Sequence, residues 1–207
     1  MATYEEVLAL AKQLALRDQL RLQTTLRETI VVGLEIAWSA PVPFSDAKSL
    51  PKVPGTYAII LDAPDGSRMV RIGATRDASR RPANYDPQPF LDEPGLRIVF
   101  AEVPQPFRAA MAVLFETGYT DLKGDIDWLE YRMERRLLEA YETKWDTLPP
   151  GNFQHGSRRP YMEHITLIET GPLRVIDLPP ADLPTDVLEG LRQSEKKAKK
   201  ELPAQPK

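Results

Sequence analysis

The sequence contains no cysteine and no long run of apolar residues. The first absence excludes disulfides, thiolate zinc sites and cysteine nucleophiles together. The second argues against a membrane-spanning helix, which needs about 20 predominantly apolar residues. The first residues also lack the basic segment that opens a secretory signal. We therefore expect a soluble, cytoplasmic protein without a membrane partner.

An excess of positive charge is missing too. The 207 residues include 27 Lys and Arg against 30 Asp and Glu, which gives a formal net charge of -3. This balance argues against binding of nucleic acid through bulk positive charge, so any contact with a polyanion has to be local. No phosphate-cradling glycine loop and no nucleophile elbow occurs, which disfavours an enzyme of small-molecule metabolism.

The chain divides by composition into four parts. Residues 1–37 are expected to form a helical N-terminal arm, because apolar residues recur at helical spacing over residues 3–30. We expect this arm to pack on its own domain or on a second copy of the chain. A helix-turn-helix that binds a protein partner or DNA is the weaker alternative, since a turn glycine and a basic recognition helix are absent. A proline-rich linker, residues 38–51, follows. The folded domain spans residues 52–178, and a polar, Lys- and Glu-rich tail, residues 179–207, is expected to be disordered.

Within the domain the pattern alternates between strands and helices. Residues 54–75 predict a β-hairpin that turns at Asp65-Gly66, and residues 95–103 predict a further strand. Residues 107–119 and 125–145 have helical spacing. Two short alternating runs, residues 163–169 and 173–178, predict a second hairpin. We expect an α/β fold with a three-stranded, mainly antiparallel sheet flanked by helices.

Three groups of residues carry candidate chemistry. Arginines, which bind phosphate bidentately, cluster after the hairpin: Arg68, Arg71, Arg76, Arg80 and Arg81. Glu130 and Glu134 lie on one helix face, where a divalent cation would relieve their repulsion. The favoured alternative is a structural role in which the nearby Arg132, Arg135 and Arg136 pair with both carboxylates. Asn152 lies in a loop that also carries Arg158 and Arg159.

The order of these features resembles the GIY-YIG nuclease domain over roughly residues 52 to 155. The resemblance is carried by Gly55-Thr56-Tyr57 on the first strand and Arg71-Ile72-Gly73 on the second, and then by Arg81, Tyr85, Glu134 and Asn152 in the order of the family. Arg71 stands where the family has its second tyrosine, and Ala74 stands where many members have a lysine.

The resemblance implies a metal-dependent endonuclease that cleaves DNA with one Mg²⁺ or Mn²⁺ ion. Glu134 would hold the metal, Arg81 would offset developing charge, and Asn152 would complete the catalytic set. Tyr57, or else Tyr85, would act as the base, because Arg71 stays protonated and cannot. Arginines would contact the nucleic acid: Arg71, Arg76, Arg80, Arg158 and Arg159.

Two alternatives stay open. The same fold could bind nucleic acid or a protein partner without cleavage, with Arg71 as one more phosphate contact. The motif residues could instead be ordinary residues of the hydrophobic core, without a role in binding or catalysis. A nuclease predicts that Tyr57, Arg81, Glu134 and Asn152 converge on one open cleft. A binding module predicts that basic residues converge while the carboxylate faces elsewhere or pairs with Arg135. The third explanation predicts that Tyr57 is buried against the helix of residues 125–145.

Overall fold

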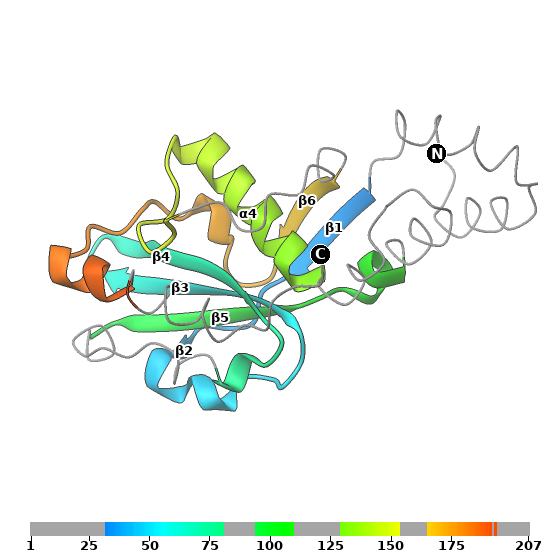
Figure 1. Cartoon of the computed structure of the whole chain (residues 1–207), viewed down its shortest axis with the longest axis horizontal. Coiled ribbons are helices and arrows are strands. Elements are labelled where there is room, and N and C mark those ends of the chain that lie inside the picture. Colours follow the sequence, from blue (N-terminus) through cyan, green and yellow to red (C-terminus); the bar gives the residue numbers. More distant parts are fainter. Residues whose placement is uncertain (1–31, 81–93, 110–128, 154–164, 192, 194–207) are drawn as a thin grey trace, which may run out of the picture.

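An antiparallel sheet forms the centre of the molecule (Figure 1). The structure, a computed structural model, describes residues 32–80, 94–109, 129–153, 165–191 and 193. The strands of this sheet lie in the order β2-β5-β3-β4. Their bounds are Val42–Pro43 for β2, Gly55–Ala63 for β3, Gly66–Thr75 for β4 and Leu96–Glu102 for β5. The expected mixed α/β architecture is confirmed, with the short β2 added to the three expected strands.

The hairpin of β3 and β4 is confirmed and follows from local sequence. Gly66 in the turn has a φ of 124°, a conformation that residues with a side chain rarely adopt. The strands pair from Gly55 opposite Thr75 down to Ala63 opposite Gly66. An irregularity between Ile59 and Ile60 shifts the register there. Such a bulge re-aims the side chains of the strand that carries the extra residue.

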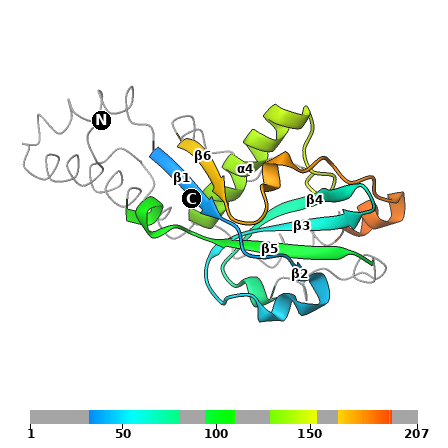
Figure 2. The ribbon, with the colours of Figure 1, turned by 180° about the vertical axis from the view of Figure 1, so that it is seen from behind.

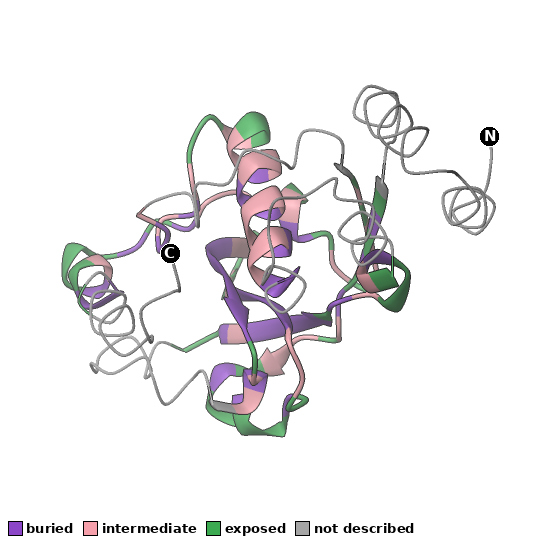
Figure 3. Cartoon of the chain, turned by 45° about the vertical axis from the view of Figure 1, so that its right-hand side comes forward, coloured by how far each residue is buried: buried purple, intermediate pink, exposed green. Residues whose placement is uncertain are grey.

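Two apolar layers cover the sheet, one on each face. The helix α4, Leu129–Trp145, packs with β3 and β4 and confirms the described part of the predicted helix. The opposite face is covered by the 3-10 helix η1, Phe44–Ser49, and by residues from the C-terminal part of the chain. Buried residues concentrate in the strands between these layers (Figure 3).

A second, two-stranded sheet corrects two expectations. Strand β1, Val32–Ala37, pairs in parallel with β6, Ile165–Thr170, beside one end of the central sheet (Figure 2). The helical arm therefore does not extend over residues 32–37. The predicted second hairpin is also wrong, because β6 takes β1 as its partner and Val175–Asp177 forms the 3-10 helix η6. Gly171 lies between them, where a Cβ would come within 2.5 Å of the Trp38 carbonyl oxygen.

The two segments expected to be a linker and a tail contribute to the core. Phe44, Ala47 and Leu50 from residues 38–51 are buried. In the C-terminal segment, the Met69 N–H donates to the Pro179 carbonyl at 2.7 Å, and the Ala181 N–H donates to the Met69 carbonyl at 2.8 Å. Residues 185–191 are helical and bury further apolar side chains on the sheet. The expectation of a disordered tail is therefore wrong for residues 179–191.

Some expectations fall outside the described residues: the helical pattern of residues 3–30, most of the helix predicted over 107–119, and the end of the tail. Residues 105–109 are helical. Within the described part of the chain, no helix combines the length and the apolar character needed to cross a membrane.

Candidate functional site

Tyr57 and the motif glycines pack against one another across the sheet. Tyr57 lies opposite Gly73, and a Cβ on Gly73 would stand 2.3 Å from both Cζ and Oη of the tyrosine. In the same way, a Cβ on Gly55 would stand 2.5 Å from Cζ of Phe100. Each glycine thus leaves room for an aromatic ring on the neighbouring strand. The small residues at the strand ends have a packing role that the hairpin alone does not require.

The Tyr57 side chain is buried on the sheet face opposite α4. Its exposed fraction is 1%, and it belongs to the apolar cluster that contains Phe44 and Phe100. The expectation that a core tyrosine here would pack against the 125–145 helix is therefore wrong, because alternation along β3 turns Ala58 toward that helix and Tyr57 away from it. The phenol has almost no contact with solvent.

Arg71 and Asn152 are used to close the free edge of β4. The Asn152 Oδ1 accepts the Ile72 N–H at 2.9 Å, and the Asn152 Nδ2 donates to the Ile72 carbonyl at 2.7 Å. The Gly151 N–H donates to the Val70 carbonyl, and the buried Arg71 guanidinium donates to the Gly151 carbonyl. The loop therefore acts as a substitute strand, which satisfies backbone groups that an edge strand leaves unpaired.

The chain leaves β4 through a tight polar turn that positions Arg76. The Asp77 N–H donates to the Thr75 Oγ1 at 3.1 Å, and the Asp77 Oδ1 accepts the Ser79 N–H at 3.0 Å. The 3-10 helix η2, Ala78–Arg80, follows at once. Arg76 is the residue between strand and turn, so its backbone is held from both sides.

Arg76 meets a buried carboxylate of α4. The Arg76 Nε lies 3.5 Å from the Glu130 Oε1; half of the arginine side chain is exposed (50%), against 2% for the glutamate. Glu130 belongs to the first described turn of α4, and the charge of Arg108, from the helical residues 105–109, also acts on it. Burial raises the pKa of Glu130; a backbone hydrogen bond and the positive charges of Arg76 and Arg108 lower it without overcoming the loss of solvation.

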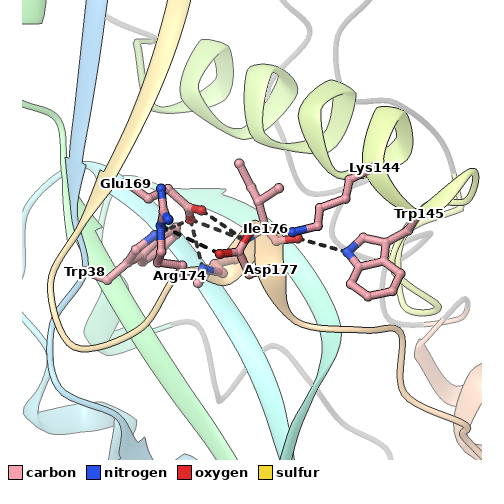
Figure 4. Close-up of polar contacts among 8 residues, drawn as sticks. Trp38, Lys144, Trp145, Glu169, Arg174, Ile176 and Asp177 are labelled. Carbon is pink, nitrogen blue, oxygen red and sulfur yellow. Dashed lines mark hydrogen bonds and ion pairs between the residues drawn. The ribbon is translucent and has the colours of Figure 1, made fainter.

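A second buried carboxylate, Glu169, differs from Glu130 because several hydrogen-bond donors surround it (Figure 4). Burial raises its pKa as well, but it accepts the Trp38 Nε1–H at 2.7 Å, the Val175 N–H at 3.0 Å and the Ile176 N–H at 3.1 Å. It thereby ties β6 to η6 and to the segment after β1. By contrast, Glu130 Oε1 has no hydrogen-bond partner among the described residues and lies 3.5 Å from the Arg76 Nε.

The expected metal ligand, Glu134, lies one turn beyond Glu130 and is partly buried. Its neighbours Arg135 and Arg136 both pair with Glu139, at 2.8 and 3.3 Å. Over the residues that the structure describes, no three His, Cys, Asp or Glu side chains gather as a metal site. The positive charges of Arg76 and Arg108 act on Glu130, which makes this carboxylate a poor ligand for a divalent cation.

The structure thus separates the predicted site residues. Tyr57 lies on one face of the sheet, Asn152 lies at the β4 edge, and Glu134 lies on the helix over the other face. The remaining predicted positions fall outside the described side chains: Arg80, Arg81, Tyr85, Arg158 and Arg159. Arg76 is the predicted nucleic-acid contact whose side chain is described and half exposed.

Sequence reasoning named Glu130 only as a neighbour of Glu134 and did not consider Arg108. A signal for Glu130 existed, because it stands three residues before Met133 and seven before Leu137, on the buried stripe of α4. A glutamate at a core position of a helix is a candidate for a paired or functional carboxylate. Arg108 offered no such signal, because its helix carries no strong pattern before residue 110.

No family model, no curated protein and no solved structure matches this chain. A function therefore has to follow from the residues of the chain itself.

Proposed function

We propose that this chain is a nucleic-acid-binding domain of the GIY-YIG type that holds a DNA phosphate at the end of β4 and does not cleave it. One observation carries the proposal: Arg76 is half exposed, held by its backbone, and paired with a buried carboxylate. A guanidinium group offers two parallel N–H donors to a phosphate, and this geometry suits it better than any other side chain. In an acidic chain, such a contact has to be local.

The arrangement of strands supports the same fold type. The order β5-β3-β4, with α4 on one face and the Asn152 loop at the edge, keeps the succession of features on which the resemblance rests. Burial of the Tyr57 phenol and the double hydrogen bond of the Asn152 amide support binding over hydrolysis, because both groups are engaged in packing or backbone pairing.

The test is a binding titration of a short fluorescent DNA duplex, followed by anisotropy at several salt concentrations. Arg76→Gln is expected to weaken binding about tenfold, as for the loss of one charge-assisted contact, and to reduce the slope of log K against log salt by about 1. Arg97→Gln is the matched control. Arg97 is also part exposed (41%) and paired with a carboxylate, Asp62, but it lies toward the hairpin end of the sheet.

Equal effects of the two substitutions, or no DNA binding by the wild type, would contradict the proposal. Capture of a protein in place of DNA would indicate the other kind of binding module. Nicking of supercoiled plasmid, with Mg²⁺ or Mn²⁺ and an EDTA control, tests the endonuclease alternative. We expect no nicking. Metal-dependent nicking that disappears in Glu134→Ala would replace the binding function with a nuclease.

A further inference from the structure

The two partners of the Arg76–Glu130 pair differ in their freedom to move. The arginine side chain is half in solvent, whereas the glutamate side chain is 2% exposed and is fixed on the sheet-facing side of α4 beside Leu129 and Met133. A phosphate that arrives from solvent can therefore attract the guanidinium away from the carboxylate. The carboxylate is held in place by the side chains that bury it between α4 and the sheet, so it does not follow the guanidinium into water.

Loss of Arg76 would leave Glu130 poorly compensated. The described charged groups that face it are Arg76, from the end of β4, and Arg108, from residues 105–109. Glu130 Oε1 has no hydrogen-bond donor among the described residues apart from the arginine at 3.5 Å. A buried carboxylate without its close counter-charge is costly, and the usual response is to bind a proton.

We infer that binding of phosphate at Arg76 is coupled to the uptake of one proton by Glu130, so that the protein binds DNA more tightly as the pH falls. The proton comes from solvent and is released when the DNA dissociates and Arg76 returns. This inference rests on the proposed function, because it assumes that Arg76 contacts phosphate. It adds a regulatory property to that contact: the Glu130 carboxylate competes with DNA for one guanidinium.

The sign and size of the effect follow from linkage. The negative phosphate and the departure of Arg76 both favour the protonated form of Glu130, so the complex binds more protons than the free protein. For one coupled proton, the association constant increases by up to tenfold for each unit that the pH falls. At low pH the carboxylate is protonated in both states, and the dependence disappears.

The experiment compares DNA affinity of the full chain and of Glu130→Gln at constant salt, from about pH 5 to about pH 8, the range above the ordinary pKa of a carboxyl group. Glutamine keeps the shape of the side chain and cannot ionise. We expect Glu130→Gln to bind DNA at least tenfold more tightly than the wild type at pH 8. The affinities of the two proteins should converge at low pH. Circular dichroism and urea titration check that the variant is folded.

Two controls isolate Glu130. Glu139→Gln removes a carboxylate from the same helix that also pairs with arginines, and its profile should match that of the wild type. Both histidines, His155 and His164, are present in all three proteins, so their titration cancels in the comparison. Calorimetry in two buffers with different ionisation enthalpies counts the protons directly. Uptake of up to one proton is expected for the wild type and none from this site for Glu130→Gln.

The outcomes distinguish a failure of the proton coupling from a failure of the proposed DNA binding. DNA binding that depends on Arg76, with parallel pH profiles for the wild type and Glu130→Gln, would overturn the coupling and leave the binding function standing. DNA binding at high pH that is tighter for the wild type than for Glu130→Gln would overturn the coupling as well. Absence of DNA binding across the pH range would overturn both.

Discussion

Substitution of Gly73 by alanine tests the packing role of the hairpin motifs most directly. The added Cβ would lie 2.3 Å from Cζ and Oη of Tyr57 and 2.7 Å from its Cε1. Ordinary carbon contacts need at least about 3.5 Å, so the ring has to move by about 1.2 Å. Tyr57 is 1% exposed and packs in the cluster of Phe44 and Phe100, which leaves it little space to move.

The expected cost is at the upper end of the range for overpacking, about 3 kcal/mol of the free energy of unfolding. A catalytic role of Gly73 alone would predict no such loss. Urea titration measures it, with Gly33→Ala as the control. Gly33 is an exposed strand residue whose Cβ would meet nothing within 4 Å, so its substitution should be neutral or should stabilise by up to about 1 kcal/mol.

A double substitution identifies the ring as the cause. Tyr57→Leu removes the atoms with which the new Cβ would collide, so Gly73→Ala should cost less than about 1 kcal/mol in that background. A coupling energy of about 2 kcal/mol is then expected between the two positions. Gly73→Ala at no cost in the wild type, or at the same cost in both backgrounds, would refute the argument.

Three further substitutions probe the other buried polar groups. Asn152→Ala should lower the free energy of unfolding by about 2–3 kcal/mol, because the N–H and carbonyl of Ile72 lose their partners; an unchanged urea midpoint would contradict this. Tyr141→Phe should be neutral or should stabilise by up to about 1 kcal/mol in thermal unfolding, since the buried hydroxyl has no hydrogen-bond partner among the described residues and burial raises its pKa; a clear loss would reveal a missed partner. Burial raises the pKa of Glu130 above its ordinary value of 4.5, so the folded protein binds a proton on this carboxylate more tightly than the unfolded chain does. The stabilisation from this proton is present below pH 4.5 and is lost as the pH rises through the pKa of the folded protein. Urea titrations of DNA-free protein should therefore show a stability that falls less steeply with pH in Glu130→Gln than in the wild type, and equal slopes would contradict the assignment.

The elements that could be predicted are those whose signals are local. The Asp65-Gly66 turn lies between two alternating runs, and the register of the hairpin follows from them. Helix α4 follows from apolar residues at helical spacing. Partners that are far apart in the sequence could not be predicted. Strand β6 alternates well enough to be a strand, but nothing near it indicates that Val32 pairs with Ile165.

The candidate site shows the same division. Arginine-rich composition after the hairpin was visible, and Arg76 was among the predicted contacts. The sequence did not reveal that Glu130 would be the buried partner of Arg76. It also did not reveal that the Asn152 amide would hydrogen-bond to the backbone of Ile72. A motif names residue types at given spacings, whereas exposure depends on which layer covers each face of the sheet.

By itself, the sequence determined the hairpin, the strand after it, the long helix and a local concentration of arginine in an acidic chain. Only the tertiary structure decided that the proline-rich segment of residues 38–51 and the segment of residues 179–191 would cover the face that carries Tyr57. The physical reason is that alternation and helical spacing arise from the backbone of a few neighbouring residues, while the burial of a phenol, a carboxylate or an amide depends on segments that reach it from elsewhere in the chain.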